Sequence, residues 1–353
     1  MSENTDKKVD EAVKEEILSY TKFKAQHSGL TKEQFDNVSA FIPGTRSTFP
    51  GYAAGFVQGG QIGTTLAPEI TAAPSGLEVA SFPMFNKEGF YSGDDDTVAI
   101  NSGRKTTGLS VKWQTETLDA HAMDAPVDVR LQRALASSGI DASLSALDLA
   151  RRQVENHKEV AIAKMFRSTG SYASSAQYNS ESGTSLWGNA ASTPIPEIFA
   201  AVETVRSLCG MRPNYFWMSP KAFRNLRINP TIINLTKFGG TPTSLGGPAT
   251  QDALGAFFGM NIVIGDNLTT TSLNGALSDA WGTDAGLCVV ADNNVASPKF
   301  AATFTSAGSP LVMPAYLDRR FGAEGSMIYS YVDYYKPFIT MNTAAFLFIN
   351  AGS

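Results

Sequence analysis

The chain has 353 residues, with 28 Lys and Arg against 33 Asp and Glu and a net charge of −5 at pH 7. Charged residues make up 17 % of the sequence, compared with roughly 25 % in an ordinary soluble protein. The acidic balance argues against sequence-independent nucleic-acid binding, which needs a basic excess. No apolar run reaches the roughly 18 residues of a membrane-spanning helix, and the charged N-terminus does not resemble a secretory signal peptide.

The charges are unevenly distributed along the chain. Residues 1–36 carry 14 of them, whereas the last 17 residues carry none. Because charge is depleted at the cores of protein–protein interfaces, this distribution predicts that other subunits cover much of the surface. A polar surface rich in Gly, Ser and Thr is the alternative.

The N-terminal region combines two short helical patterns with an extended segment. Apolar residues recur at helical spacing over 6–27, and Thr31-Lys32-Glu33-Gln34 fits the capping box of a second short helix. Residues 41–76 are rich in Gly, Pro and Thr and almost uncharged. This composition predicts an extended arm rather than a core element.

The next segment has the pattern of a long β-hairpin. An irregular strand is expected from Leu77 to Phe90, and residues 109–117 alternate between apolar and polar side chains. The stretches GDDD (93–96) and NSGRK (101–105) are typical of turns and would form a charged tip. A two-stranded ribbon is marginally stable alone, so we expect this hairpin to pack on a partner.

A long helix is the most distinctive predicted element. Asp124-Ala125-Pro126 favours the start of a short helix before it, with Asp as N-cap. Between Gly139 and Gly170 there is neither Gly nor Pro, which predicts about 28 helical residues, or about 42 Å. The apolar run VAIAKMF (160–166) predicts burial of its C-terminal end, and His157 is expected to be a packing residue on its apolar stripe, along with Leu144.

The second half of the chain alternates between helical and strand-like patterns after a polar loop over 170–196. Gly210 and Gly259 are expected to end two of the helices. Helices are predicted at about 196–208, 220–228 and 252–258, and strands at 214–219, 261–266, 286–292, 327–335 and 339–350.

No catalytic, cofactor or metal site is predicted, so we do not expect an enzyme. The stretch GGQIGTT (59–65) lacks the spacing and the Lys of a phosphate-binding loop, and the chain has no G-x-S-x-G nucleophile motif. Cys209 and Cys288 lie in predicted regular elements and are interpreted as buried, inert thiols. His27 and His121 have no nearby Cys or second His that could complete a metal site.

Two groups of charged residues are candidates for contacts between subunits. The first lies at the hairpin tip, where the acidic triplet lacks the ligand spacing of a calcium-binding loop and is either solvated or faces basic groups on a neighbour. The second lies on the long helix, where a solvated face is the alternative. The candidate residues are Asp94, Asp95, Asp96, Arg104, Lys105, Arg151 and Arg152.

Three patterns and the order of the elements resemble a known family. The patterns are SLSALDLARRQVENHKEVAIAKMF, EIFAAVETVRSLCGMRPNYFWMSPKAFRNLRINP and ALGAFFGMNIVIGDN. The chain resembles the major capsid proteins of tailed bacteriophages, which implies an α+β fold of the Hong Kong 97-like type. The implied regions are N-terminal helices and arm (1–75), an extended β-hairpin or E-loop (76–120), a peripheral or P domain with a long spine helix (121–195), an axial or A domain (196–320) and return strands of the P domain (321–353).

The resemblance also implies a function and partners. Such a protein self-assembles into hexamers and pentamers that form the icosahedral or prolate head shell of a virion, and it is assembled in the host cytoplasm. The shell encloses double-stranded DNA without sequence-specific binding, and the expected partners are a separate scaffolding protein, a portal protein and a decoration protein. Two alternatives stay open: an encapsulin-like nanocompartment shell, and an α/β enzyme built on residues 196–350.

Overall fold

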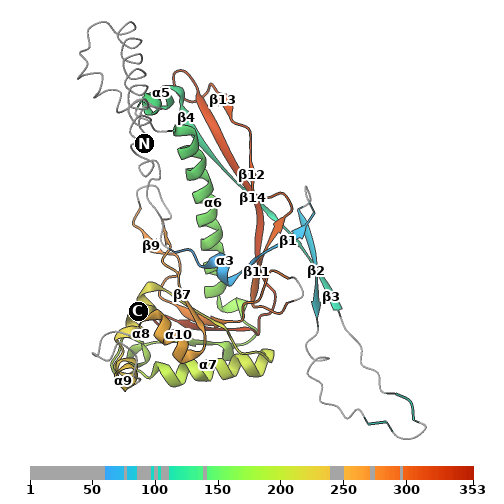
Figure 1. Ribbon diagram of the computed structural model, residues 1–353, viewed down its shortest axis with the longest axis vertical. Coiled ribbons are helices and arrows are strands. Elements are labelled where there is room, and N and C mark those ends of the chain that lie inside the picture. Colours follow the sequence, from blue (N-terminus) through green and yellow to red (C-terminus); the bar gives the residue numbers. More distant parts are fainter. Residues whose placement is uncertain are drawn as a thin grey trace, which may run out of the picture. The chain divides into compact units, whose positions relative to one another are not determined.

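A computed structural model of the chain describes residues 60–74, 78–85, 97–98, 102–104, 111–137, 141–238, 250–270, 275–294 and 297–353 (Figure 1). The chain divides into two compact units. The first includes Asp124–Ala150 and Pro314–Ser330, and the second comprises Val57–Met123, Arg151–Met313 and Tyr331–Ser353. The helices predicted over 6–27 and from Thr31 lie outside the described residues.

Most predicted helices are confirmed, the long one with 26 residues. Gly210 and Gly259 follow two of them with φ of 80° and 68°, a left-handed conformation that glycine adopts without strain. Two helices were missed. One lies within the predicted arm, and the other begins at Pro230, which was expected only to end the preceding helix but is well tolerated at a first helical position. The α-helices are α3 (Gly63–Leu66), α5 (Val129–Ser137), α6 (Ala142–Arg167), α7 (Pro194–Cys209), α8 (Pro220–Ile228), α9 (Pro230–Phe238) and α10 (Gln251–Phe258).

The apolar stripe of α6 differs from the predicted one. Most of its buried residues follow steps of four along one row of the helix surface, with Glu159 and Ala163 buried beside this row, whereas the predicted members Leu144 and His157 are exposed. The interpretation of His157 as a packing residue is therefore wrong. The buried row is Ala142, Ala146, Ala150, Val154, Lys158, Ile162 and Phe166.

The prediction of a helix that begins at Asp124-Ala125-Pro126 is also wrong. These residues belong to strand β4 (Asp119–Asp128), and α5 begins only at Val129. The capping carboxylate is that of Asp128, whose Oδ1 accepts the backbone N–H of Arg130 at 2.8 Å. Within the described chain β4 pairs only with β14 (Ser326–Ile339), which leaves a free edge where Pro126 is tolerated.

A five-stranded mixed sheet forms the centre of the larger core in the second unit. Its order is β5-β15-β10-β6-β7, and α7 to α10 gather around it (Figure 1). All four residues of β10 are buried. The segment 170–196, predicted to be a polar loop, also contains a strand of this sheet, β5, and the fully buried side chain of Trp187. The strands are β5 (Tyr178–Ser180), β6 (Tyr215–Met218), β7 (Asn261–Ile264), β10 (Ala285–Cys288) and β15 (Ala345–Ile349).

The second sheet has six strands, with the order β1-β11-β14-β12 and with β4 and β13 also paired to β14. The end of the predicted arm is part of it, which corrects the expectation for 41–76 where the structure describes that segment. Leu66, Ala67 and Ile70 are buried, and β1 pairs in parallel with β11. The remaining strands here are β1 (Glu69–Ala73), β11 (Ala301–Ser306), β12 (Leu311–Val312) and β13 (Tyr316–Asp318); β8 (Leu268–Thr269) and β9 (Ser278–Asp279) form a separate pair.

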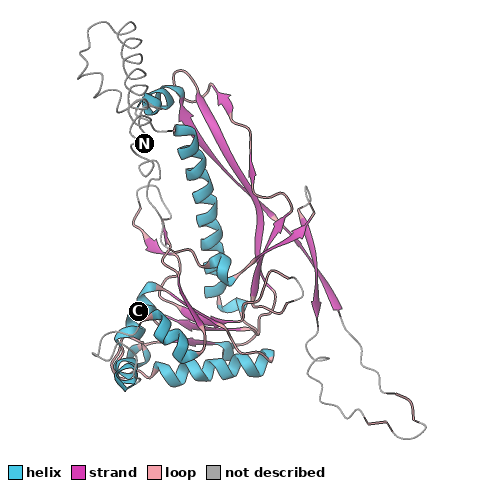
Figure 2. Cartoon of the chain, in the orientation of Figure 1, coloured by secondary structure: helices cyan, strands magenta, loops and turns pink. Residues whose placement is uncertain are grey.

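The described part of the hairpin confirms the prediction of two antiparallel strands. β2 (Val79–Phe85) and β3 (Val111–Thr117) pair with Val79 opposite Thr117 and Phe85 opposite Val111. Figure 2 shows these two strands extending away from β1 and β11. Most of the predicted tip, including 86–96 and 105–110, lies outside the described residues.

Candidate assembly site

The buried carboxylate of Glu159 on α6 fixes the segment that enters the six-stranded sheet. It accepts the backbone N–H groups of Ile62 at 3.0 Å and Gly63 at 2.7 Å, and the indole N–H of Trp281 at 2.8 Å. A Cβ at Gly63 would lie 2.5 Å from Glu159 Oε2, so the contact requires glycine. The chain following the predicted arm is therefore anchored to the long helix at α3.

Lys158, the preceding residue, makes a second link to the same segment. Its Nζ lies 2.8 Å from Glu69 Oε1 on β1 and 2.7 Å from Asp333 Oδ2 on β14. Burial alone would lower the pKa of Lys158, but the hydrogen bonds and charges of Asp333 and Glu69 outweigh it and hold the pKa above its ordinary value. Lys158 therefore stays charged and ties α6 to two strands of the sheet. Removing one partner of such a buried pair costs about 3–5 kcal/mol.

Two aromatic rings extend this cluster. The Lys158 ammonium lies 4.6 Å from the centre of the Tyr335 ring, and the His121 ring stacks on Tyr335 at 3.9 Å. Burial lowers the pKa of His121, although the charges of Asp119 and Asp333 oppose this effect. His121 is thus a neutral stacking partner at physiological pH.

One face of the β2–β3 hairpin is attached to the sheet of its own chain. Phe82 is buried, with its ring 4.4 Å from that of Phe304 and 5.4 Å from that of Phe338. Lys336 Nζ adds an ion pair with Glu116 Oε2 at 3.0 Å. These contacts position the base of the hairpin.

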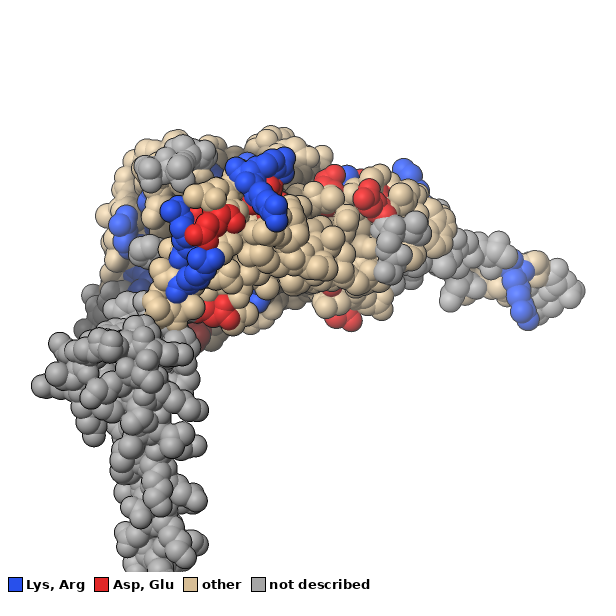
Figure 3. All heavy atoms as spheres, turned by 90° about the horizontal axis from the view of Figure 1, so that it is seen from above, with Lys and Arg blue, Asp and Glu red and all other residues tan. Residues whose placement is uncertain are grey.

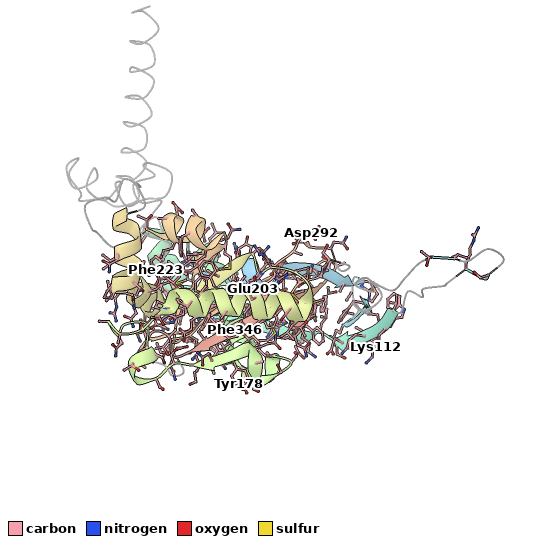
Figure 4. The ribbon with its side chains drawn as sticks, turned by 90° about the horizontal axis from the view of Figure 1, so that it is seen from below. Lys112, Tyr178, Glu203, Phe223, Asp292 and Phe346 are labelled. Carbon is pink, nitrogen blue, oxygen red and sulfur yellow. The ribbon has the colours of Figure 1, made fainter. Side chains whose placement is uncertain are left out.

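The described residues of the chain leave the opposite face of the hairpin uncovered. We call it the open face; it consists of Val79, Ser81, Pro83, Val111, Trp113, Thr115 and Thr117, which the antiparallel register places on one side. Trp113 is 67 % exposed and Val79 49 % exposed. Aromatic residues are enriched at protein interfaces, so this face has the composition of a contact surface. Figure 4 labels Lys112, the neighbour of Trp113 on β3.

The structure describes three of the seven predicted contact residues. Arg104 is exposed, and Asp94, Asp95, Asp96 and Lys105 lie outside the described residues. On α6, Arg151 is exposed and its Nε lies 2.7 Å from Glu155 Oε1. Its neighbour Arg152 is partly buried. The charge of Arg151 is thus partly compensated within its own chain.

The structure gives little basis for catalytic chemistry in the described part of the chain. Cys209 and Cys288 are buried free thiols, as predicted, and burial raises the pKa of Cys288. Among the described residues, there is no group of three or more His, Cys, Asp or Glu side chains that could hold a metal ion. None of the described helices combines the length and the apolar composition needed to cross a membrane. Figure 3 shows a face on which uncharged residues predominate.

Sequence reasoning missed the anchoring pair Lys158 and Glu159. A signal for it exists, because the two charges stand directly before the apolar run VAIAKMF (160–166). Charges that enter a buried helix segment need partners, so such a pair indicates an anchoring contact. Trp113 was placed on the correct strand, but its exposure depends on which hairpin face meets the sheet.

The chain is similar to phage proteins over most of its length. No family model matches the sequence. It is 22 % identical over 302 residues to the major capsid protein of Burkholderia phage BcepMu, covering 84 % of this chain and 92 % of that one. A phage-related protein from Bordetella bronchiseptica RB50 has 25 % identity and a TM-score of 0.64, with 85 % and 95 % of the two chains covered. The capsid of cyanophage P-SCSP1u has 11 % identity and a TM-score of 0.53, with 91 % and 98 % covered.

Fold and relatives together define a class of protein. The α+β architecture is the Hong Kong 97-like capsid fold, which confirms the fold expected from the sequence. Within that class, the chain is similar to the BcepMu major capsid protein, so the comparisons favour a capsid shell protein of the tailed-phage type. The encapsulin alternative is less supported, because the curated relative is a phage capsid protein.

Proposed function

We propose that this capsid protein forms hexamers and pentamers that tile an icosahedral or prolate head around double-stranded DNA. The observation that carries the proposal is the open face of the hairpin, where the 67 % exposed Trp113 lacks cover from the chain's own described residues. In a closed shell a neighbouring subunit would cover this face. The low proportion of charged residues, 17 % of the sequence, supports the same conclusion.

We further propose that successive regions of the chain have different structural roles. Residues 1–75 act as the N-terminal helices and arm, 76–120 as the E-loop, 121–195 with 321–353 as the P domain, and 196–320 as the A domain. The anchor at Lys158 and Glu159 would then hold the base of the arm. The seven charged residues Asp94, Asp95, Asp96, Arg104, Lys105, Arg151 and Arg152 are proposed as contacts to neighbours.

The proposed partners follow from the same role. A separate scaffolding protein, a portal protein and a decoration protein would assemble with the shell in the host cytoplasm, and the product is a component of the virion. The role is structural and not enzymatic. With a net charge of −5, the shell would enclose DNA by closing around it rather than by binding it tightly.

Light scattering after size-exclusion chromatography, followed by electron microscopy of the purified protein, tests the proposal. We expect rings of five or six subunits or closed shells, and nuclease-protected DNA inside particles isolated from an infected host. A stable 37.7 kDa monomer over a wide range of concentration and salt would contradict self-assembly. Particles that hold protein cargo and no DNA would instead favour the encapsulin-like alternative.

A further inference from the structure

Two carboxyl groups and an amide converge at the β5 edge of the five-stranded sheet. Glu181 directly follows β5, and Glu197 lies in the first turn of α7. The side-chain nitrogen of Asn179 lies 2.8 Å from Glu181 Oε1 and 3.3 Å from Glu197 Oε1. In Figure 4, β5 with Tyr178, β15 with Phe346 and α7 with Glu203 mark the surroundings of this group.

The negative charge of this group is poorly compensated. Glu181 is only 2 % exposed, and its buried Oε2 has no hydrogen-bond partner among the described residues. A buried carboxylate oxygen without a partner is costly. No Lys or Arg of the described chain forms an ion pair with Glu181 or Glu197. Burial, followed by the charge of Glu181, raises the pKa of Glu197 to about 7.

The spacing of the three side chains suits a hard cation. The oxygen and nitrogen of an Asn amide have nearly the same shape, so a half-turn places Asn179 Oδ1 where Nδ2 now lies. The amide oxygen would then lie about 2.8 Å from Glu181 Oε1 and about 3.3 Å from Glu197 Oε1. Neighbouring ligands of an octahedral ion bound at 2.0–2.1 Å lie about 2.9 Å apart, and those of Ca²⁺ somewhat further.

We propose that Asn179, Glu181 and Glu197 form a binding site for a hard divalent cation, Mg²⁺ or Ca²⁺. Asn179 is exposed and Glu197 partly so, which leaves the site open for entry and for water ligands. A bound cation would link β5 to α7, and this role is independent of the proposed shell function.

Binding can be measured on the full-length protein after treatment with EDTA and dialysis. We would titrate MgCl₂ and CaCl₂ by calorimetry, and Tb³⁺ as a Ca²⁺ substitute with excitation through tryptophan, since the Trp187 indole lies beside the Glu197 carboxyl. We expect one saturable site per chain with micromolar to millimolar affinity. The affinities of the two ions decide which of them the site prefers.

Three variants make the experiment decisive. Glu197→Gln should weaken binding at least tenfold, whereas Asn179→Asp should strengthen it because it adds a third carboxylate. Glu203→Gln is the matched control, since Glu203 lies on the same helix and pairs with Arg206, and binding should not change. No saturable binding, or an equal loss in Glu203→Gln, would overturn the proposal. If Glu197→Gln does not fold, an unchanged affinity in the exposed-site variant Asn179→Asp would overturn it too.

Discussion

Trp217 and Trp113 both lie on β-strands, but Trp217 has no exposed surface whereas Trp113 is 67 % exposed. Trp217 belongs to the five-stranded sheet, where helices and neighbouring strands of the same chain bury it. Trp113 belongs to the hairpin, of which only one face meets the sheet. The first region is stabilised within one chain, while the open face of the second has no cover from the described residues and, in our proposal, is buried by another subunit. Substitutions in the two regions should therefore separate folding from assembly.

The largest effect is expected from Trp217→Ala. The Trp217 ring lies 5.0 Å from that of Trp281 and 6.0 Å from that of Phe166, in the larger core. Removing a fully buried aromatic side chain costs about 3–5 kcal/mol, a large share of the roughly 5–15 kcal/mol by which domains are stable. We expect low soluble yield and a strongly lowered urea midpoint. A midpoint equal to that of the wild type would contradict the central role of this sheet.

A smaller loss of stability is expected from Phe82→Ala at the base of the hairpin. Phe82 packs in a separate, smaller cluster with Phe304 and Phe338. We expect the free energy of unfolding to fall by about 3 kcal/mol, which is the lower end of the range for truncating a buried aromatic side chain to Ala. Limited proteolysis should show earlier cleavage in residues 78–118 than in the wild type, while residues 194–290 stay protected. Simultaneous cleavage of both segments would show that the two regions do not unfold separately.

Trp113→Ala should leave folding nearly unchanged and still impair assembly. Substituting an exposed side chain usually changes the free energy of unfolding by no more than about 0.5 kcal/mol. Truncating an aromatic anchor at an interface, by contrast, often weakens binding by about 2 kcal/mol or more. Size-exclusion chromatography and electron microscopy should show fewer closed particles at an unchanged urea midpoint. Lys112→Ala, on the same strand but outside the open face, is the control. Normal particle yields from Trp113→Ala would remove the main support for the hairpin contact.

The sequence predicts best what depends on neighbouring residues. The helices α6, α7 and α10 follow from apolar spacing, capping residues and glycines that are all local. By contrast, the parallel pairing of β1 with β11 places Ile70 opposite Phe304, and nothing near either residue shows this. Asp124 and Pro126 carry the local signature of a helix start, but pairing of β4 with β14 overrides it.

In the candidate assembly site, too, the sequence predicts the local features and misses the long-range contacts. The alternation around Trp113 predicted a strand correctly, because strand periodicity is local. The partners of Glu159 are Ile62 and Trp281, which are separated from it by 97 and 122 positions. Contacts over such distances depend on the tertiary fold, so the sequence could indicate only that a buried charge needs partners.

The smallest expected effect concerns the ion pair between Glu116 and Lys336, and it depends on pH. The Glu116 carboxylate accepts hydrogen bonds from Gln114 Nε2 and Lys336 Nζ, both at 3.0 Å. The hydrogen bond from Gln114, and next that from Lys336, lower the pKa of Glu116 below its ordinary value. A carboxyl group whose pKa is lower in the folded state stabilises the fold above its unfolded pKa of about 4.3. This contribution is lost as the pH falls through the folded pKa.

Glu116→Gln keeps the shape of the side chain and removes this charge. At pH 7 we expect the variant to be less stable than the wild type by about 0.2–1 kcal/mol, because the pair is partly exposed. The difference between the two urea midpoints should shrink as the pH falls through the folded pKa of Glu116, because below it the wild-type carboxyl group is also protonated. Glu203→Gln, with its exposed partner Arg206, should show a smaller difference at pH 7. A difference for Glu116→Gln that stays the same down to the lowest pH at which both proteins fold would mean that packing, and not the charge, attaches the hairpin to its sheet at this position.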